Sequence, residues 1–221
     1  MLILTTIGFD EKFIVRSLLR NKVGRGDKMV VFLFEGYEEN DKVMNALKSV
    51  KNILENVIFD EDFVVEKLPK SDEIDVFLRI RKAILSNLTG DRQILAILSG
   101  GMRPLLITIL MALFKTDDAK IIIESEYENF EGHVVYDMSP FKAERNEKWI
   151  NIIECLMEGD SLRGISRRTG LSLASISREL QRMMKYNLVR PQRSLSRITG
   201  YEVTDSGKIY LRLYKDSGVK E

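Results

Sequence analysis

Residues 94–104 read ILAILSGGMRP, an apolar run that ends in a serine, two glycines, a methionine, an arginine and a proline. A short apolar run without alternation is typical of a parallel-sheet strand that is covered on both faces. The paired glycines allow a tight turn, and Pro104 is well suited to the first position of a helix. This stretch therefore predicts a central strand that passes directly into a helix.

Short apolar runs alternate with helical patterns on both sides of this stretch, as expected for parallel strands joined by crossover helices. Between the strands, apolar residues recur at helical spacing and predict amphipathic helices. One such set is Val43, Leu47, Val50, Leu54 and Val57, and another is Ile74, Phe77, Leu78, Ile84, Leu85 and Leu88. We predict strands at 2–7, 29–34, 63–68 and 94–98, helices at 10–20, 43–57, 74–88 and 104–115, and an edge hairpin at 120–126 and 133–138. The fold class of residues 1–140 is thus α/β, a Rossmann-like domain with a mainly parallel sheet and a C-terminal edge hairpin.

The second half of the chain has a different pattern. Two helical segments, at 161–169 and 172–187, begin at the expected N-caps Ser161 and Ser172. A short turn containing Gly170 separates them, which is the arrangement of a helix-turn-helix. We also predict a helix at 147–158, short strands at 188–189 and 201–203 around a loop, and a closing helix at 207–214. Residues 147–221 are therefore expected to form an α+β winged helix-turn-helix domain, joined to the first domain by a polar linker at 141–146.

Charge is unevenly distributed between the two halves. The whole chain has a net charge of +1, but residues 1–140 contain 18 Lys and Arg against 23 Asp and Glu, a net charge of −5. Residues 141–221 contain 16 against 10, a net charge of +6, and residues 161–201 contain nine basic side chains and one acid, Glu179. A basic segment joined to an acidic domain indicates that only the second half binds a polyanion.

The helix predicted at 172–187 combines a basic face with an apolar face that we expect to be buried: Leu173, Ile176, Leu180 and Met183. An α-helix fits the major groove of DNA, where Arg and Gln pair with base edges, while hydroxyl groups, backbone N–H groups and further arginines hold phosphates. A solvated basic face is the ordinary alternative, but the turn, the caps, the basic loop and the charge excess together favour DNA binding. The predicted DNA contacts lie on two helices and in the loop of the wing: Arg163, Arg167, Arg168, Ser172, Ser175, Arg178, Gln181, Arg182, Lys185, Arg193 and Arg197.

Several protein classes are disfavoured by the composition. A single cysteine, Cys155, and a single histidine, His133, do not suffice for a multi-cysteine or histidine-rich metal site, and we expect a buried thiol and a structural histidine. No apolar run approaches about 18 residues, and no basic segment precedes the apolar N-terminus, so neither a membrane span nor a secretory signal is expected. We therefore expect a cytoplasmic protein without a metal cofactor. Because Gly-x-Gly-x-x-Gly and Gly-x-x-x-x-Gly-Lys are both absent, we also expect no NAD or ATP cofactor.

Two loops of the first half are candidate ligand contacts. In open α/β sheets, ligands bind beyond the carboxyl ends of the strands where the strand order reverses. Residues 6–10 and 99–104 each follow a predicted strand, and the second loop combines Gly100, Gly101 and Arg103. Glycine N–H groups can form an anion-binding nest, so these loops favour a phosphate or phosphodiester ligand. A tight strand-to-helix turn without a ligand is the alternative for the two glycines.

The second half resembles the winged helix-turn-helix domains of MarR- and ArsR-like regulators over about residues 145–215, through residues 162–171, 172–186, 188–189 and 204–207. The complete chain resembles the CRISPR-associated regulators, known chiefly from archaea, that join an N-terminal CARF domain to a C-terminal winged helix. The residues that carry this resemblance are Leu4–Phe9, Ser99–Pro104 and the order of the domains.

This resemblance implies a CARF dimer whose equivalent loops face each other across a two-fold axis and hold a cyclic oligoadenylate, for which cyclic tetra-adenylate is the expected ring. CARF loops often have a small polar residue where Met102 stands. The implied ligand contacts are Thr6, Gly8, Phe9, Ser99, Gly100, Gly101, Met102 and Arg103.

The implied function is a ligand-responsive transcription regulator of CRISPR-associated antiviral genes, a homodimer that binds a pseudo-palindromic operator in double-stranded DNA. Two alternatives remain open. One is a ring nuclease that slowly cleaves its own ligand through a ribose 2′-OH, with Ser99 and Arg103 as the residues that would help. The other is a regulator of the same architecture that senses another metabolite. The first half has no evident Ser-His-Asp or metal constellation, so we expect no enzyme, with slow ring-nuclease activity left open.

Overall fold

The computed structural model describes residues 1–194 and 197–215. The chain divides into two compact units, Met1–Asp137 and Met138–Glu221, and we describe each by itself. Among the described helices, none is both long and apolar enough to cross a membrane.

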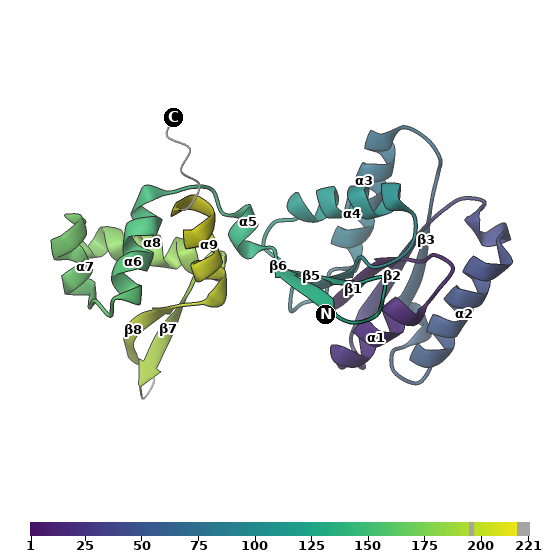
Figure 1. The fold of residues 1–221 in the computed structure, drawn as a ribbon, viewed down its shortest axis with the longest axis horizontal. Helices are drawn as coiled ribbons and strands as arrows, with labels where there is room; N and C mark the ends of the chain where they lie inside the picture. The colour runs from purple at the N-terminus through teal and green to yellow at the C-terminus, as the bar shows by residue number, and fades with distance from the viewer. Residues whose placement is uncertain (195–196, 216–221) are drawn as a thin grey trace. The chain divides into compact units, whose positions relative to one another are not determined.

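The first unit is built on a six-stranded sheet in the order β3-β2-β1-β4-β5-β6 (Figure 1). The first five strands pair in parallel, and β6 runs antiparallel to β5. The strands are β1 (Leu2–Thr6), β2 (Lys28–Phe34), β3 (Phe63–Leu68), β4 (Gln93–Ile97), β5 (Lys120–Glu126) and β6 (His133–Asp137). The predicted Rossmann-like α/β fold with a C-terminal edge hairpin is therefore confirmed for this unit.

Four helices cover the two faces of this sheet. In Figure 1, α1 (Lys12–Arg20) and α2 (Asp41–Leu54) lie on one face, and α3 (Glu73–Asn87) and α4 (Arg103–Phe114) lie on the other. The short 3-10 helices η1 (Tyr37–Glu39) and η2 (Asp60–Asp62) lie in the connections before α2 and β3. The connections from β1 and from β4 leave in opposite directions, so the strand order reverses between these two neighbours.

The central strands are buried on both faces. All five residues of β1 and Ile94–Ile97 of β4 are buried, as the apolar run at 94–98 predicted. The prediction for α3 was partly wrong, because Ile74, Leu78 and Leu85 are exposed. Its core contacts come from Val76, Ile80, Ala83 and Ile84 instead, so this helix has a second apolar surface that faces outward.

In its described residues, 138–194 and 197–215, the second unit combines five helices with one hairpin. Its elements are α5 (Ser139–Lys142), α6 (Glu147–Met157), α7 (Leu162–Thr169), α8 (Leu173–Lys185), β7 (Val189–Ser194), β8 (Arg197–Val203) and α9 (Asp205–Lys215). Its own hydrophobic core includes Trp149, Ile153, Ile176, Leu180 and Tyr210. Cys155 is buried, as expected, and burial is the main cause that raises the pKa of its thiol.

Two segments of this unit differ from the prediction. Residues 141–146, expected to be a polar linker, include the end of α5 and pack on α9. Tyr210 donates to the carbonyl of Glu144 at 2.9 Å, and Tyr214 donates to that of Ala143 at 2.8 Å. The loop predicted at 190–200 is mostly strand, because cross-strand pairing continues from Val189↔Val203 to Ser194↔Arg197. Residues 195–196, also part of that predicted loop, lie outside the described residues.

Candidate functional site

The loops that follow β1 and β4 are in direct contact. A Cβ atom added to Gly8 would lie 3.0 Å from the backbone nitrogen of Gly101, and one added to Gly101 would lie 2.6 Å from Cγ2 of Thr6. Gly101 also has φ of +94°, which disfavours any residue with a side chain. Glycine at both positions therefore lets the two loops meet at the point where the strand order reverses.

A cavity of about 300 Å³ opens beside these loops. The sequence-predicted contacts Gly8, Phe9, Gly100, Gly101 and Met102 line it, together with Asp10, Phe13 and Tyr37. The structure thus brings residues from both predicted loops to one hollow, whose other walls come from the start of α1 and from η1.

Three predicted ligand contacts lie outside this lining. Thr6 is fully buried beneath Gly101, and its Oγ1 has no hydrogen-bond partner. Ser99 faces β5, where its Oγ accepts from the backbone N–H of Glu126 at 2.9 Å. Arg103 is exposed at the first residue of α4. Thr6 therefore supports the shape of the pocket, whereas the charge of Arg103 is exposed to solvent at the N-terminus of α4.

Asp10 belongs to one of the predicted loops but was not a predicted contact, and Phe13 and Tyr37 lie outside both predicted loops. Phe13 lies in the first turn of α1, where an aromatic residue is typical of a core position. Tyr37 follows β2, whose loop was not among the predicted ligand loops. The rule that directed attention to the ends of β1 and β4 applies equally to β2, the parallel neighbour of β1. Tyr37 was therefore predictable, but the inward position of Phe13 was not.

The pocket has one end suited to an anion. The N-cap residue of α4, Met102, makes no side-chain hydrogen bond, so the first-turn N–H groups of this 12-residue helix have no side-chain cap. The partial positive charge of a helix N-terminus and the nearby Arg103 both favour a negatively charged group. The carboxylate of Asp10 opposes this, but it already accepts from the N–H of Lys12 at 2.9 Å and lies 3.6 Å from the Lys12 ammonium.

The second unit presents a separate basic surface on α7 and α8. Ser161 caps α7 by accepting from Gly164 N at 3.2 Å, and Ser172 caps α8 by accepting from Ser175 N at 3.1 Å. Gly170, with φ of +71°, ends α7 and turns the chain into α8. The predicted capping and turn are thus present, and the Ser172 oxygen is used by the helix itself.

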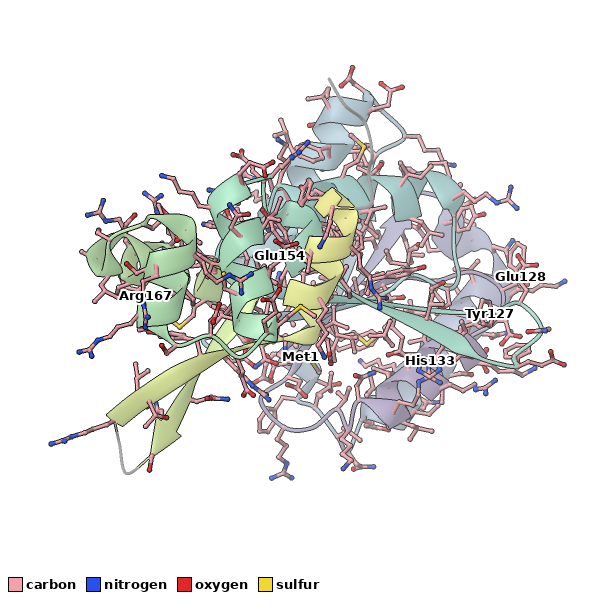
Figure 2. All side chains as sticks on the ribbon, turned by 60° about the vertical axis from the view of Figure 1, so that its left-hand side comes forward. Met1, Tyr127, Glu128, His133, Glu154 and Arg167 are labelled. Atoms are coloured by element: carbon pink, nitrogen blue, oxygen red, sulfur yellow. The ribbon has the colours of Figure 1, made fainter. Side chains whose placement is uncertain are left out.

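The predicted DNA contacts differ in how free their side chains are. Arg168 is ion-paired with Glu158 and Asp160, at 2.8 Å from the latter, and these pairs raise its pKa. Arg182 lies 3.4 Å from the buried carboxylate of Glu179. No ion pair within residues 1–194 and 197–215 holds the other predicted basic side chains, which are exposed: Arg163, Arg167 (Figure 2), Arg178, Lys185, Arg193 and Arg197. Gln181 is also exposed, and Ser175 is half-buried.

The apolar face of α8 is anchored in the core by one unexpected acid. Ile176, Leu180 and Met183 are buried as predicted, whereas Leu173 is exposed because it lies in the first turn, beyond the core. Glu179 is 6% exposed and accepts from Nε1 of Trp149 at 2.8 Å. The single acid of this basic region is therefore a buried structural group, and the exposed surface of α8 has no negative charge.

Metal binding has no support in the part of the chain that the structure describes. No group of three His, Cys, Asp or Glu side chains there is arranged to hold a metal ion. His133 is exposed at the start of β6.

Comparisons with known proteins gave one similar solved structure and one matching family model. Among solved structures, the chain is similar to Can2 from Sulfobacillus thermosulfidooxidans in complex with cyclic tetra-adenylate, with 11% sequence identity and a TM-score of 0.39. That similarity covers 95% of this chain and 61% of the Can2 chain. No curated protein matches the sequence. Residues 1–136, more than half of the chain, match the Csa3 CRISPR-associated Rossmann-like domain, and the protein therefore belongs to this CARF family.

Proposed function

We propose that this protein is a ligand-responsive transcription regulator in which a CARF domain, residues 1–140, controls a winged helix-turn-helix domain, residues 147–221. The observation that carries the proposal is the pocket between the glycine loops of β1 and β4, in the same chain as a basic helix-turn-helix surface. The proposed ligand is a cyclic oligoadenylate, with cyclic tetra-adenylate as the expected ring.

The chemistry of the pocket suits such a ligand in two ways. Bases of nucleic acids stack on aromatic side chains, and Phe9, Phe13 and Tyr37 all line the cavity. A phosphodiester suits the glycine loop and the start of α4, where the backbone is accessible and Arg103 adds positive charge.

An exposed apolar surface favours a homodimer. Large apolar side chains are exposed on the neighbouring helices α3 and α4: Ile74, Leu78, Leu85, Ile107, Met111 and Phe114. Single exposed apolar residues are ordinary, but a group of them on adjacent helices is typical of an interaction surface. Because α4 begins in the second glycine loop, a second copy on this surface would bring two pockets close together, as a ring shared across a two-fold axis requires.

The second unit has the features of a DNA-binding domain. In a helix-turn-helix, the second helix enters the major groove, and here α8 presents Arg178, Gln181 and Arg182 on its exposed side. Arg163 and Arg167 of α7 and Arg193 and Arg197 of the hairpin are then placed for phosphates. In a symmetric dimer the two recognition helices would read half-sites about 34–36 Å apart, which implies a pseudo-palindromic operator.

The ligand claim is tested by calorimetric titration of the full-length protein with cyclic tetra-adenylate. We expect one ring per two chains and weaker binding by the Arg103→Ala variant. Lys48→Ala, which removes an exposed cation on α2 outside the pocket, is the control and should bind as the wild type does. A folded protein that gives no binding would refute the proposed ligand, and thermal-shift screening of other nucleotides would then test for a different metabolite. Conversion of the ring to a linear product would instead indicate a ring nuclease.

The DNA claim is tested by fluorescence anisotropy with duplexes from the promoters of CRISPR-associated genes. We expect the Arg178→Ala/Arg182→Ala variant to fold and to lose affinity for the operator. Arg212→Ala, which removes an exposed arginine of α9, is the matched control. Unchanged binding by the double variant would refute the assignment of α8 as the recognition helix.

A further inference from the structure

The loop between β5 and β6 is fastened to α1. The ring of Phe130 stacks on that of Phe13, with centroids 4.6 Å apart and planes inclined by 10°. The guanidinium of Arg16 lies 5.5 Å from the centre of the Phe130 ring and donates to the Phe130 carbonyl at 3.3 Å and 3.4 Å. We call Phe13, Arg16 and Phe130 the clasp; in Figure 2 the labels of Tyr127, Glu128 and His133 mark the hairpin that it holds.

The clasp keeps Phe130 in a strained conformation. Its φ is +59°, in the left-handed region that bulky residues rarely adopt and that persists only where the surroundings hold it. A cavity of about 420 Å³, lined by Val15, Arg16, Ile53 and Phe130 among others, lies beside the ring. Loss of the stack would therefore relieve strain, and the ring has adjacent space into which it can move.

The clasp also touches the proposed ligand pocket. Phe13 is a wall of that pocket, and a Cβ atom added to Gly100 would lie 3.9 Å from its ring. The neighbouring Ser99 is hydrogen-bonded to the backbone of Glu126, at the base of the same hairpin. The buried Glu126 carboxylate in turn lies 3.4 Å from Arg16 and 2.6 Å from Arg20. The second glycine loop is thus linked to the hairpin through Phe13 and through Glu126.

The hairpin lies at the connection between the units. Its second strand, β6, pairs with β5 from Glu126↔His133 to Ile122↔Asp137, and the next residue, Met138, begins the second unit. The loop at 127–132 is therefore separated from the start of that unit by a strand of only five residues.

We propose that the clasp reports occupancy of the pocket to β6. This inference rests on the proposed ligand function. A ligand that fills the pocket displaces the Phe13 ring, Phe130 leaves its left-handed conformation, and β6 shifts against β5. The ligand drives this change only because it binds the released state more tightly than the clasped one. Since such coupling is reciprocal, a variant that is already released binds the ligand more tightly than the wild type does.

Hydrogen–deuterium exchange of the full-length protein, with and without cyclic tetra-adenylate, tests this mechanism. In the wild type, we expect the ligand to accelerate amide exchange in residues 127–137. Phe130→Gly removes the stack and tolerates a positive φ, so it should exchange rapidly without ligand, respond little to it and bind it at least about 5-fold more tightly, the low end of ordinary coupling. Val135→Ala, which changes an exposed side chain of β6 outside the clasp, should behave as the wild type does.

Each outcome decides between the two proposals. If the wild type binds the ring without a change in exchange at residues 127–137, or if Phe130→Gly binds it no more tightly, the clasp mechanism is wrong and the ligand function stands. If the wild type does not bind the ring, the ligand function fails and the clasp mechanism fails with it. Should Phe130→Gly not fold, Arg16→Gln removes the guanidinium that holds the Phe130 carbonyl and is expected to shift exchange and affinity in the same direction.

Discussion

Substitution of Gly101 by alanine tests the contact between the two glycine loops most directly. The new Cβ would lie 2.6 Å from Cγ2, 2.7 Å from Oγ1 and 3.0 Å from the carbonyl carbon of Thr6. Thr6 is fully buried in β1 and has no room to withdraw. The residue would also have to keep φ near +94°.

The expected loss of stability follows from these two effects. A left-handed conformation costs a residue with a side chain about 1–2 kcal/mol, and overpacking of a filled site costs about 1–3 kcal/mol. The sum of about 2–5 kcal/mol is a large part of the ~5–15 kcal/mol that stabilises a typical domain. At roughly 4 °C per kcal/mol, the Tm of the first unit should fall by about 8–20 °C.

The assay is thermal unfolding of the full-length protein, monitored by tryptophan fluorescence and by circular dichroism. Trp149 is the only tryptophan and lies in the core of the second unit, so its fluorescence reports that unit, whereas far-UV circular dichroism reports both. We expect Gly101→Ala to shift the dichroism transition of the first unit and to leave the Trp149 transition in place.

Two further variants test whether the clash with Thr6 causes the loss of stability. Gly100→Ala places a Cβ 3.9 Å from Phe13, an ordinary contact, and should change stability by no more than about 0.5 kcal/mol. Adding Thr6→Ala to Gly101→Ala removes the two closest atoms and should restore part of the loss. If Gly101→Ala is as stable as Gly100→Ala, the two loops are not in the contact described here.

Three other predictions concern the second unit. Arg167→Ala should weaken binding to duplex DNA and lower the slope of log K against log salt by about one phosphate contact. Arg168→Ala should change the affinity and the slope less, because Arg168 is already ion-paired with Glu158 and Asp160. Equal effects of the two variants in anisotropy titrations would contradict this distinction. Glu179→Ala leaves the Nε1 donor of Trp149 unpaired in the core and should lower the free energy of unfolding in urea by about 1–3 kcal/mol. The Trp149 emission should also shift, and an unchanged emission maximum would argue against the hydrogen bond. Burial raises the pKa of Tyr210 to about 12, above its ordinary value near 10, so its contribution to stability is complete below pH 10 and is lost as pH rises through 12. Tyr210→Phe should remove about 3 kcal/mol of this pH dependence, and parallel stability curves for variant and wild type would disprove it.

The arrangement of strands and helices was predictable because local patterns determine it. The apolar run at 94–98 is long enough for one buried strand, and the glycines and proline that follow it stop the strand and start α4 at Arg103. The same reasoning located β3 at its observed bounds, Phe63–Leu68, and the serine caps of α7 and α8. The mainly parallel sheet followed from the alternation of short apolar strands with helical segments.

Only the tertiary structure decided which of these residues share a site. The sequence placed two glycine loops at strand ends, but it contained no sign that Gly101 lies against Thr6 or that Phe13 turns toward Gly100. Tyr37 was predictable only as a residue that follows β2, and the structure brings it to the same pocket. Those contacts join residues about 30 to 95 positions apart, and they depend on the neighbouring positions of β1, β2 and β4 in the sheet. The same applies to Arg168 and Glu179, whose sequence context is basic and exposed but whose roles are set by Asp160 and Trp149 across the fold. Local periodicity therefore determines the elements, whereas long-range packing determines which side chains are free to bind a ligand or DNA.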